Sequence, residues 1–198
     1  MLMLRNGEVH YPNRIVRLCD ISIAPKEVVG LCGPSGCGKS TLAKVLASIQ
    51  PLTHGFVSLP SRQKGKPNPV QWVAQQPEFA FNPYLTLRQS LQESWKNVDY
   101  SPLLDAFSIC SSWLERKPNQ LSGGQLQRLN LVRALVPTTQ FLLCDEISAP
   151  LDLLTQKQLW QTLLHHCRMN EIGLLVMSHD SLLLEKICER VIDITQQK

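Results

Sequence analysis

The sequence predicts an α/β fold in which a parallel sheet is covered by helices on both faces. Three observations support this prediction: short apolar runs of strand length, amphipathic helical segments that alternate with them, and a glycine-rich stretch directly after the first clear run. Such alternation is typical of parallel sheets, because the crossover helices cover the faces of the sheet. The chain has 198 residues, which suits one domain or one domain with a small lobe.

In the first half of the chain, we expect a strand, a helix and two further strands. The apolar run Val28–Cys32 has the length of a buried strand. In 39–49, apolar residues recur at i, i+3, i+4 and i+7, which predicts an amphipathic helix that ends before Pro51. Segments 56–59 and 70–74 are expected to be strands, separated by a turn rich in Pro, Gly and Lys.

The chain becomes helical in its middle and then alternates again. The expected elements are a helical segment at 85–115 interrupted at Pro102, a helix at 125–136, a buried strand at 141–144, a helix at 155–168, a buried strand at 173–177 and a shorter strand at 190–194. The mainly helical stretch interrupts the alternation of strands and helices. We therefore expect a helical lobe at about 78–122, inserted into a core formed by about 1–77 and 123–198.

Composition and charge are those of an ordinary globular protein, with 43% hydrophobic residues, 18% charged residues and a formal net charge of +4. The seven cysteines show no CxxC pair and no metal-ligand spacing, which argues against a zinc site and favours a reducing, intracellular setting. Arg62, Lys64 and Lys66 lie among Pro and Gly, so this run is interpreted as a solvated turn, and no nucleic-acid partner is expected. No run approaches the about 20 apolar residues of a membrane span, so any membrane association is expected to come through a partner.

The strongest single signal is the pattern G-x-x-x-x-G-K-[ST] after the strand Val28–Cys32, known as a P-loop or Walker A motif. Its glycines let backbone N–H groups turn toward an anion, and the N-terminus of the following helix also favours negative charge. Lys39 is expected to reach the β- and γ-phosphates of a nucleotide, and Ser40 to ligate Mg²⁺. The candidate nucleotide-binding residues of this motif are Gly33, Pro34, Ser35, Gly36, Cys37, Gly38, Lys39, Ser40 and Thr41.

A second apolar run, 141–144, ends in two carboxylates, which is the Walker B pattern. In open α/β sheets, ligands lie beyond the carboxyl ends of the strands, so these carboxylates are expected near Ser40. Asp145 would hold Mg²⁺ through water, and Glu146 would polarise the attacking water as a general base. An acidic pair after a strand can also simply cap the next helix, but the P-loop in the same chain favours the catalytic interpretation.

The segment 121–125, Leu-Ser-Gly-Gly-Gln, followed by Leu-Gln-Arg, resembles the signature sequence of ABC ATPases. Ser122 and the two glycines are expected to open a helix whose N-terminal donors favour anions. The resemblance covers essentially the whole chain from Tyr11 onward. It implies a P-loop NTPase core with a parallel sheet, an N-terminal antiparallel β lobe and an inserted α-helical lobe.

The resemblance also implies a second ATPase subunit and two molecules of ATP with Mg²⁺. In the family, the signature segment contacts the γ-phosphate that the P-loop of the other subunit holds. ATP would then close a head-to-tail dimer, and hydrolysis would let it open. The matching signature residues in this chain are Ser122, Gly123, Gly124 and Gln125.

Four further positions match motifs of the family. Tyr11 lies upstream of the P-loop, where the family usually has an aromatic residue that stacks on adenine. Gln75 matches the glutamine that meets Mg²⁺ and the membrane partner. Asp152 matches the aspartate of the loop that couples the two sites, and His179 matches the histidine that contacts the γ-phosphate. A tyrosine in a β-rich lobe is often a core residue. A lone histidine is more often structural, but this one follows a buried strand and lies between Ser178 and Asp180, as the family pattern has it.

Two positions depart from the family pattern. Ile147 stands where the family usually has proline, and Pro150 stands where it usually has a small residue. Both lie in the loop that couples the two nucleotide sites, so we expect unusual coupling without the loss of a catalytic group. The β lobe is also short between Gly55 and Gln75.

The stretch 75–86, which contains Gln-Gln-Pro and Asn-Pro, resembles the peptide and nickel importer branch of the family. This implies a subunit that hydrolyses ATP to power import of a small solute through transmembrane permease subunits, at the cytoplasmic face of the cell membrane. An extracytoplasmic solute-binding protein would complete the complex. Such importers usually pair two different ATPase subunits, so the mate is either a second copy or a related chain.

Two other functions stay open on the sequence alone: an ABC ATPase that acts without transport, and a nucleotide-dependent regulatory module that does not hydrolyse ATP. Repair and chromosome ATPases carry long coiled-coil insertions, and translation types carry two cassettes; this sequence has neither feature. The presence of Gln75, Glu146 and His179 argues against the regulatory module.

Cys37 places a thiol inside the P-loop. Because Cys37 lies in the P-loop beside the N-terminus of the following helix, we predict that stoichiometric alkylation of Cys37 blocks ATP hydrolysis and that bound ATP protects the thiol. The measurement is the hydrolysis rate against the extent of labelling at Cys37, followed by mass spectrometry. Unchanged hydrolysis at full labelling would show that the thiol is an inert small residue.

Overall fold

The computed structural model describes residues 1–96, 98–149 and 151–196. Pro150, one of the two departures from the family pattern, lies outside the described residues. The strands are β1 (Leu2–Tyr11), β2 (Arg14–Arg17), β3 (Ile21–Ile23), β4 (Val28–Cys32), β5 (His54–Ser58), β6 (Val70–Val73), β7 (Phe141–Asp145), β8 (Gly173–Ser178) and β9 (Arg190–Asp193). The α-helices are α1 (Lys39–Leu46), α2 (Leu87–Ser94), α3 (Ser101–Ala106), α4 (Gly123–Ala134), α5 (Leu153–Met169) and α6 (Ser181–Ile187), with short 3₁₀ helices at Pro77–Ala80, Ser111–Trp113, Pro118–Gln120 and Ile194–Gln196.

The predicted parallel sheet is confirmed. Within the described residues, its strands lie in the order β6-β7-β8-β4-β9, and each neighbouring pair is parallel. Successive residues of a strand face opposite sides, so the sheet separates two apolar clusters. Leu142, Leu174 and Val176 belong to the cluster that contains the buried residues of α4, α5 and α6. Leu143 and Leu175 belong to the other cluster, with α1 and the N-terminal strands.

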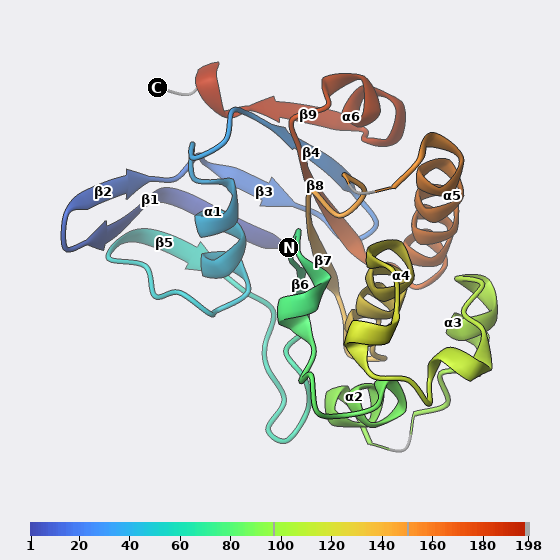
Figure 1. Ribbon diagram of the computed structural model, residues 1–198. Helices are drawn as coiled ribbons and strands as arrows, with labels where there is room; N and C mark the ends of the chain where they lie inside the picture. The colour runs from blue at the N-terminus through green and yellow to red at the C-terminus, as the bar shows by residue number, and fades with distance from the viewer. Residues whose placement is uncertain (97, 150, 197–198) are drawn as a thin grey trace.

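A second, antiparallel sheet forms the N-terminal lobe that the family resemblance implied. In it, β1 pairs with β2, β3 and β5. This sheet lies at the left in Figure 1, with α1 in front of it, and the parallel sheet runs through the centre. Hydrophobic periodicity predicts only β5 of this sheet. β2 and β3 span only four and three residues, and the ten-residue β1 is interrupted by Asn6 and Gly7, so its apolar positions do not alternate throughout.

The end of α1 and the place of Pro102 differ from the prediction, and each difference has a physical cause. α1 ends at Leu46 rather than at residue 49, because Ser48 takes a left-handed conformation with φ +59°, three residues before Pro51. Pro102 does not interrupt a helix. It lies in the first turn of α3, where an N–H would have no partner within the helix. The expected helical segment 85–115 is therefore α2 and α3 with a connection between them.

One helix was not predicted from the sequence. α6 begins after Asp180, whose side chain accepts a hydrogen bond from the Leu183 N–H at 3.0 Å and so caps the helix. The apolar residues of this short helix follow the strand β8 so closely that periodicity does not separate the two elements.

The elements of the stretch 78–122 are mostly helical, as expected. Their buried apolar side chains, including Leu87, Leu91 and Phe107, share one cluster with α4 and with one face of the parallel sheet. The division into a core and a helical lobe remains a prediction. Across the described residues, every helix is too short or too polar to traverse a bilayer.

Gly55 occupies a strained place between β5 and β1. Its φ is +103°, and a Cβ built there would lie 2.3 Å from the carbonyl oxygen of Asn6. We predict that Gly55→Ala lowers the free energy of unfolding by roughly 2–4 kcal/mol, because both the backbone conformation and the close approach exclude a side chain. Urea-induced unfolding measures the change.

Gly65→Ala is the matched control for this substitution. Gly65 has φ +77°, but a Cβ built there has no atom within 4 Å. Only the conformational cost of about 1 kcal/mol is expected. Equal losses in the two variants would contradict a special role for the contact with Asn6.

Candidate active site

The carboxyl ends of neighbouring parallel strands bring most of the predicted residues together. β4 ends just before the P-loop, β7 ends at Asp145, and β8 ends just before His179. Because β8 lies between β7 and β4, these three strand ends open onto one edge of the sheet. Gln75 follows β6, which pairs with the other side of β7.

The P-loop encloses the amino group of Lys39. This side chain is 6% exposed, and its Nζ donates to the carbonyl oxygens of Gly33 at 2.6 Å and Pro34 at 3.1 Å. Gly38 precedes α1 with φ +107°, and a Cβ built there would lie 3.2 Å from Val16 Cγ1. Glycine is therefore required at position 38 by the backbone and by the fit against β2. Two backbone carbonyl groups of the loop therefore hold the amino group of Lys39 in place.

A cavity of about 490 Å³ opens between the P-loop and the hairpin of β1 and β2. Its lining includes ten of the predicted site residues: Tyr11, Ser35, Gly36, Gly38, Lys39, Ser40, Thr41, Gln75, Asp145 and Glu146. Three further lining residues were missed by the sequence analysis: Arg14, Val16 and Lys44. Gly33, Pro34 and Cys37 belong to the loop but do not line this cavity.

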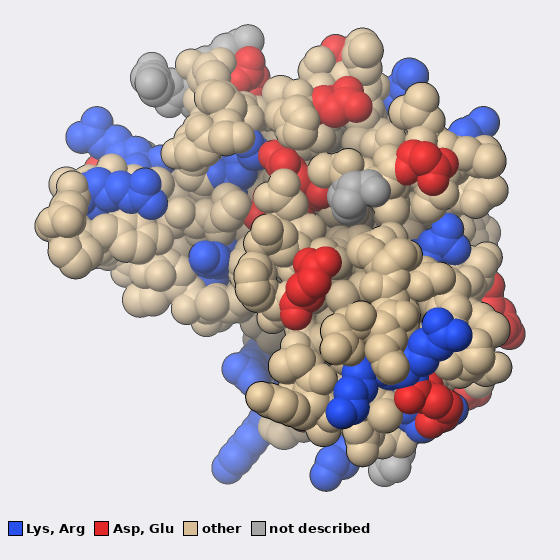
Figure 2. All heavy atoms as spheres, viewed as in Figure 1, with Lys and Arg blue, Asp and Glu red and all other residues tan. Residues whose placement is uncertain are grey.

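The sequence positions of Arg14 and Lys44 could have identified them as site residues. Arg14 pairs with Tyr11 across a two-residue turn, and opposite residues of an antiparallel pair project from the same face. The guanidinium carbon of Arg14 lies 5.3 Å from the centre of the Tyr11 ring. Lys44 is about one helical turn beyond Ser40 on α1. Basic side chains gather around the β1–β2 hairpin and α1 at the left of Figure 2, whereas both signs are mixed over the right half.

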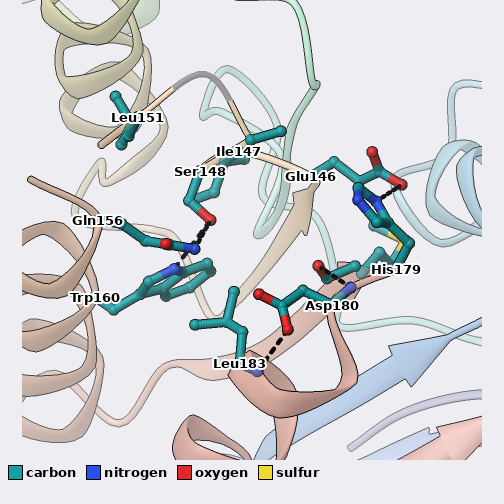
Figure 3. A pocket seen from close by; sticks show the side chains of 12 residues that line it. Glu146, Ile147, Ser148, Leu151, Gln156, Trp160, His179, Asp180 and Leu183 are labelled. Atoms are coloured by element: carbon teal, nitrogen blue, oxygen red, sulfur yellow. Dashed lines mark hydrogen bonds and ion pairs between the residues drawn. The ribbon is translucent and has the colours of Figure 1, made fainter. Parts of the chain in front are cut away.

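The Glu146 carboxylate is the point where the predicted catalytic residues meet. Gln75 Nε2 donates to its Oε2 at 3.1 Å, and His179 Nδ1 lies 3.4 Å from its Oε1. Lys39 Nζ lies 3.9 Å from the same Oε1, and the glutamate side chain is 13% exposed. Figure 3 shows Glu146 and His179 pointing toward one another. The backbone of Glu146 has φ +51°, a left-handed conformation that non-glycine residues seldom adopt.

Asp145 is buried directly beside Ser40. Burial raises the pKa of its carboxyl, and a hydrogen bond with the Ser40 hydroxyl opposes that shift. A carboxylate and a hydroxyl at a phosphate cavity suit Mg²⁺, which prefers oxygen ligands and commonly combines one or two carboxylates with substrate phosphates. Among the described residues, no group of three or more His, Cys, Asp and Glu could hold a metal by itself. The residues thus fit a metal ion that binds together with a nucleotide.

The signature segment does not line the P-loop cavity of its own chain. Ser122 caps α4: its Oγ accepts from the Gln125 N–H at 3.3 Å, and Gln125 Oε1 accepts from the Ser122 N–H at 3.1 Å. Gly123 follows the cap without close neighbours, whereas a Cβ built at Gly124 would lie 2.8 Å from Leu151 Cδ2. The segment therefore presents a capped helix N-terminus and rests on the loop that precedes α5.

Asp152 also lies outside the P-loop cavity. Its Oδ1 accepts hydrogen bonds from the backbone N–H groups of Thr155 at 3.0 Å and Leu154 at 3.1 Å, so it is the N-cap of α5. The hydrogen bonds from Thr155 hold the pKa of the Asp152 carboxyl below its usual range. Within one chain, therefore, Asp152 and the signature residues do not line the cavity in which most of the other predicted site residues meet.

The buried Asp145 carboxylate should make the protein without nucleotide less stable as pH rises. Its folded-state pKa is raised, so its contribution to stability is present below the unfolded pKa and is lost as pH increases through the folded pKa. We predict that Asp145→Asn raises the free energy of unfolding at pH 7 by about 1 kcal/mol and flattens this pH dependence. Urea unfolding from about pH 3 to about pH 8, a range that brackets the usual carboxyl pKa of about 4, measures both effects. Asp105→Asn, at an exposed position of α3, is the control and should change neither; a destabilised Asp145→Asn protein would contradict the prediction.

Comparisons with known proteins identify the family of the chain. A family model described as ABC transporter matches residues 16–149. The chain is 32% identical over 205 residues to the nickel import system ATP-binding protein NikE of Staphylococcus aureus (strain N315), covering 97% of this chain and 85% of that protein. It is also 32% identical to the nickel import ATP-binding protein NikE of Escherichia coli (strain K12), covering 94% and 76% of the two chains.

Solved structures agree on the fold. A dimeric bacterial ABC transporter cassette has a TM-score of 0.83 at 24% identity, over 98% of this chain and 94% of that one. A cassette in a post-hydrolysis state, bound to ADP and Pi, has a TM-score of 0.81 at 24% identity with the same coverage. Because the family model matches more than half of the chain and both relatives are covered over most of their length, the chain belongs to the ABC transporter family and is an ATPase of the cassette type.

Proposed function

We propose that this chain is the ATP-hydrolysing subunit of an importer for a small solute such as nickel or a peptide, and that it acts through membrane permease subunits. One observation carries the catalytic part of the proposal: the Glu146 carboxylate, at the edge of the P-loop cavity, is contacted by Gln75, His179 and Lys39. The solute class is supported by the relatives, which are nickel import ATP-binding proteins.

ATP would lie along the cavity, with its base on Tyr11 and its phosphates in the P-loop. Arg14, Lys39 and Lys44 line this cavity, so their positive charge offsets the charge of the triphosphate. Backbone N–H groups of the loop and the N-terminus of α1 would donate to phosphate oxygens. Lys39 is already held inside the loop, so little side-chain freedom remains to be lost on binding.

Mg²⁺ is the metal that suits this donor set. The Ser40 hydroxyl and the Asp145 carboxylate would hold it together with phosphate oxygens, and Gln75 is the next oxygen donor along the edge of the sheet. When bound, the ion neutralises charge that develops on the phosphates. The chain's own contribution is to keep a buried carboxylate beside Ser40, in the position where a divalent cation relieves its unfavourable burial.

Glu146 would act as the general base. Its carboxylate takes the proton of a water molecule as the water oxygen attacks the γ-phosphorus, and the bond to the β-phosphate oxygen breaks to give ADP and phosphate. Gln75 and His179 lie on either side of this carboxylate and restrict its direction. His179 is largely exposed, with 66% of its side chain accessible, so it can also meet a γ-phosphate.

A mate subunit would complete the site. The signature residues do not line the chain's own P-loop cavity, so a γ-phosphate that they contact would be held by another subunit. The mate is either a second copy or a related ATPase subunit. A solved cassette of the same fold is dimeric, which is consistent with this arrangement.

The remaining partners follow from the importer role. We place the chain at the cytoplasmic face of the cell membrane, bound to permease subunits, with an extracytoplasmic solute-binding protein in the complex. The supporting facts are the names of the relatives and the match to the ABC transporter family.

Glu146→Gln tests the proposed chemistry. We predict that it lowers kcat for ATP hydrolysis at least about 100-fold, because an amide cannot accept the proton, while ATP binding persists and the ATP-bound dimer accumulates. Phosphate release measures turnover, and light scattering with ATP and Mg²⁺ measures the dimer, with the mate subunit present.

Glu185→Gln on α6 is the matched control, since its side chain is exposed, and it should behave as the unmodified chain. Retained turnover in the Glu146→Gln variant would exclude Glu146 as the base. An unmodified chain that binds ATP with its mate but never releases phosphate would instead support a regulatory module.

A further inference from the structure

A buried hydrogen-bond cluster ties the loop after Glu146 to helix α5. The Ser148 hydroxyl oxygen accepts two hydrogen bonds, from Gln156 Nε2 at 3.0 Å and from Trp160 Nε1 at 3.2 Å. Ser148 is 5% exposed and Trp160 is 3% exposed, so water hardly competes for these bonds. Figure 3 shows both donors reaching from α5 to the loop. We call Ser148, Gln156 and Trp160 the Ser148 node.

The backbone that precedes the node is strained. Glu146 has φ +51°, and such a conformation persists only when the surrounding structure holds it. On the upstream side, the Glu146 N–H donates to the carbonyl oxygen of Met177 at 2.9 Å, which ties it to β8. On the downstream side, the side chain of Ile147 is 1% exposed and packs in the core, but Ile147 has no ring to fix its φ. The hydrogen bonds of the residues that follow add a second downstream restraint.

Those residues form a short turn. The Ala149 N–H donates to the carbonyl oxygen of Glu146 at 3.2 Å, and the Leu151 N–H donates to that of Ser148 at 3.1 Å. These bonds set the local shape of the turn, but both join residues within the loop. Among the side-chain hydrogen bonds of the described residues, only those of Ser148 join this turn to a long element, the 17-residue helix α5.

The loop also has free space beside it. A cavity of about 290 Å³ is bordered by Glu146, Ser148, Trp160 and His179, among others. Side chains on the edge of a cavity lack packing partners on that side, so packing alone does not fix the loop. The node and the catalytic carboxylate border the same space, so a shift of the loop would move the carboxylate.

We infer that Ser148 is a positioning residue for hydrolysis: its attachment to α5 keeps Glu146 in the strained conformation that directs the carboxylate toward Lys39, Gln75 and His179. The inference rests on the proposed role of Glu146 as general base. A displacement of about 1 Å at a reacting group can cost about 100-fold in rate. The node does not line the P-loop cavity. Removing it should therefore lower kcat without changing KM for ATP.

The test uses Ser148→Ala and Trp160→Phe in the complex with the mate and the permease subunits. Trp160→Phe removes the N–H donor and keeps an aromatic ring. Each variant is expected to lower kcat by about 5- to 50-fold and to leave KM for ATP within about twofold. Ser148→Thr keeps the hydroxyl and should recover most of the lost kcat.

Tyr100→Phe is the matched control. The Tyr100 hydroxyl is buried and donates to the carbonyl oxygen of Leu91 at 3.1 Å, in a different part of the chain. This variant should lower Tm and keep the unmodified kcat, which separates lost stability from lost positioning. The inference would be overturned, and the proposed function left intact, if both Ser148→Ala and Trp160→Phe kept the unmodified kcat. The same holds if KM for ATP rose as much as kcat fell, or if Ser148→Thr did not recover the lost kcat. An unmodified complex without turnover would overturn the proposed function and this inference with it.

Discussion

The strand order β7-β8-β4 forces three chemically different strand ends into one place. In the register of these strands, Cys32 lies opposite Ser178, and Asp145 lies opposite Met177. Each strand is apolar until its last residues, so polar groups emerge only at the edge where all three end. The P-loop, the acidic pair and His179 are far apart in the sequence, and this edge alone brings them together.

Bringing these strand ends together leaves two carboxylates in energetically unfavourable surroundings. Asp145 is buried beside Ser40 with a raised pKa, and Glu146 combines a low exposure with a strained backbone. A buried charge is tolerated only when partners surround it. For Glu146, these partners are Lys39, Gln75 and His179, the same groups to which the proposed chemistry assigns roles. Stability and catalysis therefore depend on one set of contacts, and a change in any member affects both.

Sequence reasoning predicted that most of the candidate site residues lie together, because their motifs follow the ends of apolar runs and the rule for parallel sheets places those ends at one edge. It missed Arg14 and Val16 because their approach to the P-loop depends on the register of β1 and β2. Neither strand of that hairpin has a sustained periodicity, since β2 spans four residues and Asn6 and Gly7 interrupt β1. It missed the Ser148 node because Trp160 on an amphipathic helix is typical of a core residue. Only the structure shows that its N–H bonds the loop hydroxyl. The roles assigned to the site residues themselves stay predictions.

The contacts around α5 give a physical reason to expect communication between two sites of a dimer. Gly124 of the signature segment lies against Leu151, which belongs to the same loop as Ser148. A phosphate that the mate holds and the signature contacts would displace the backbone at Gly124. Because glycine has no side chain that could adjust instead, this displacement would reach Leu151 directly. The displaced loop is joined to Glu146 on one side and to α5 on the other. Occupation of the mate's site would thus reach this chain's own catalytic carboxylate through a few residues, with Ser148 limiting how far that carboxylate can move.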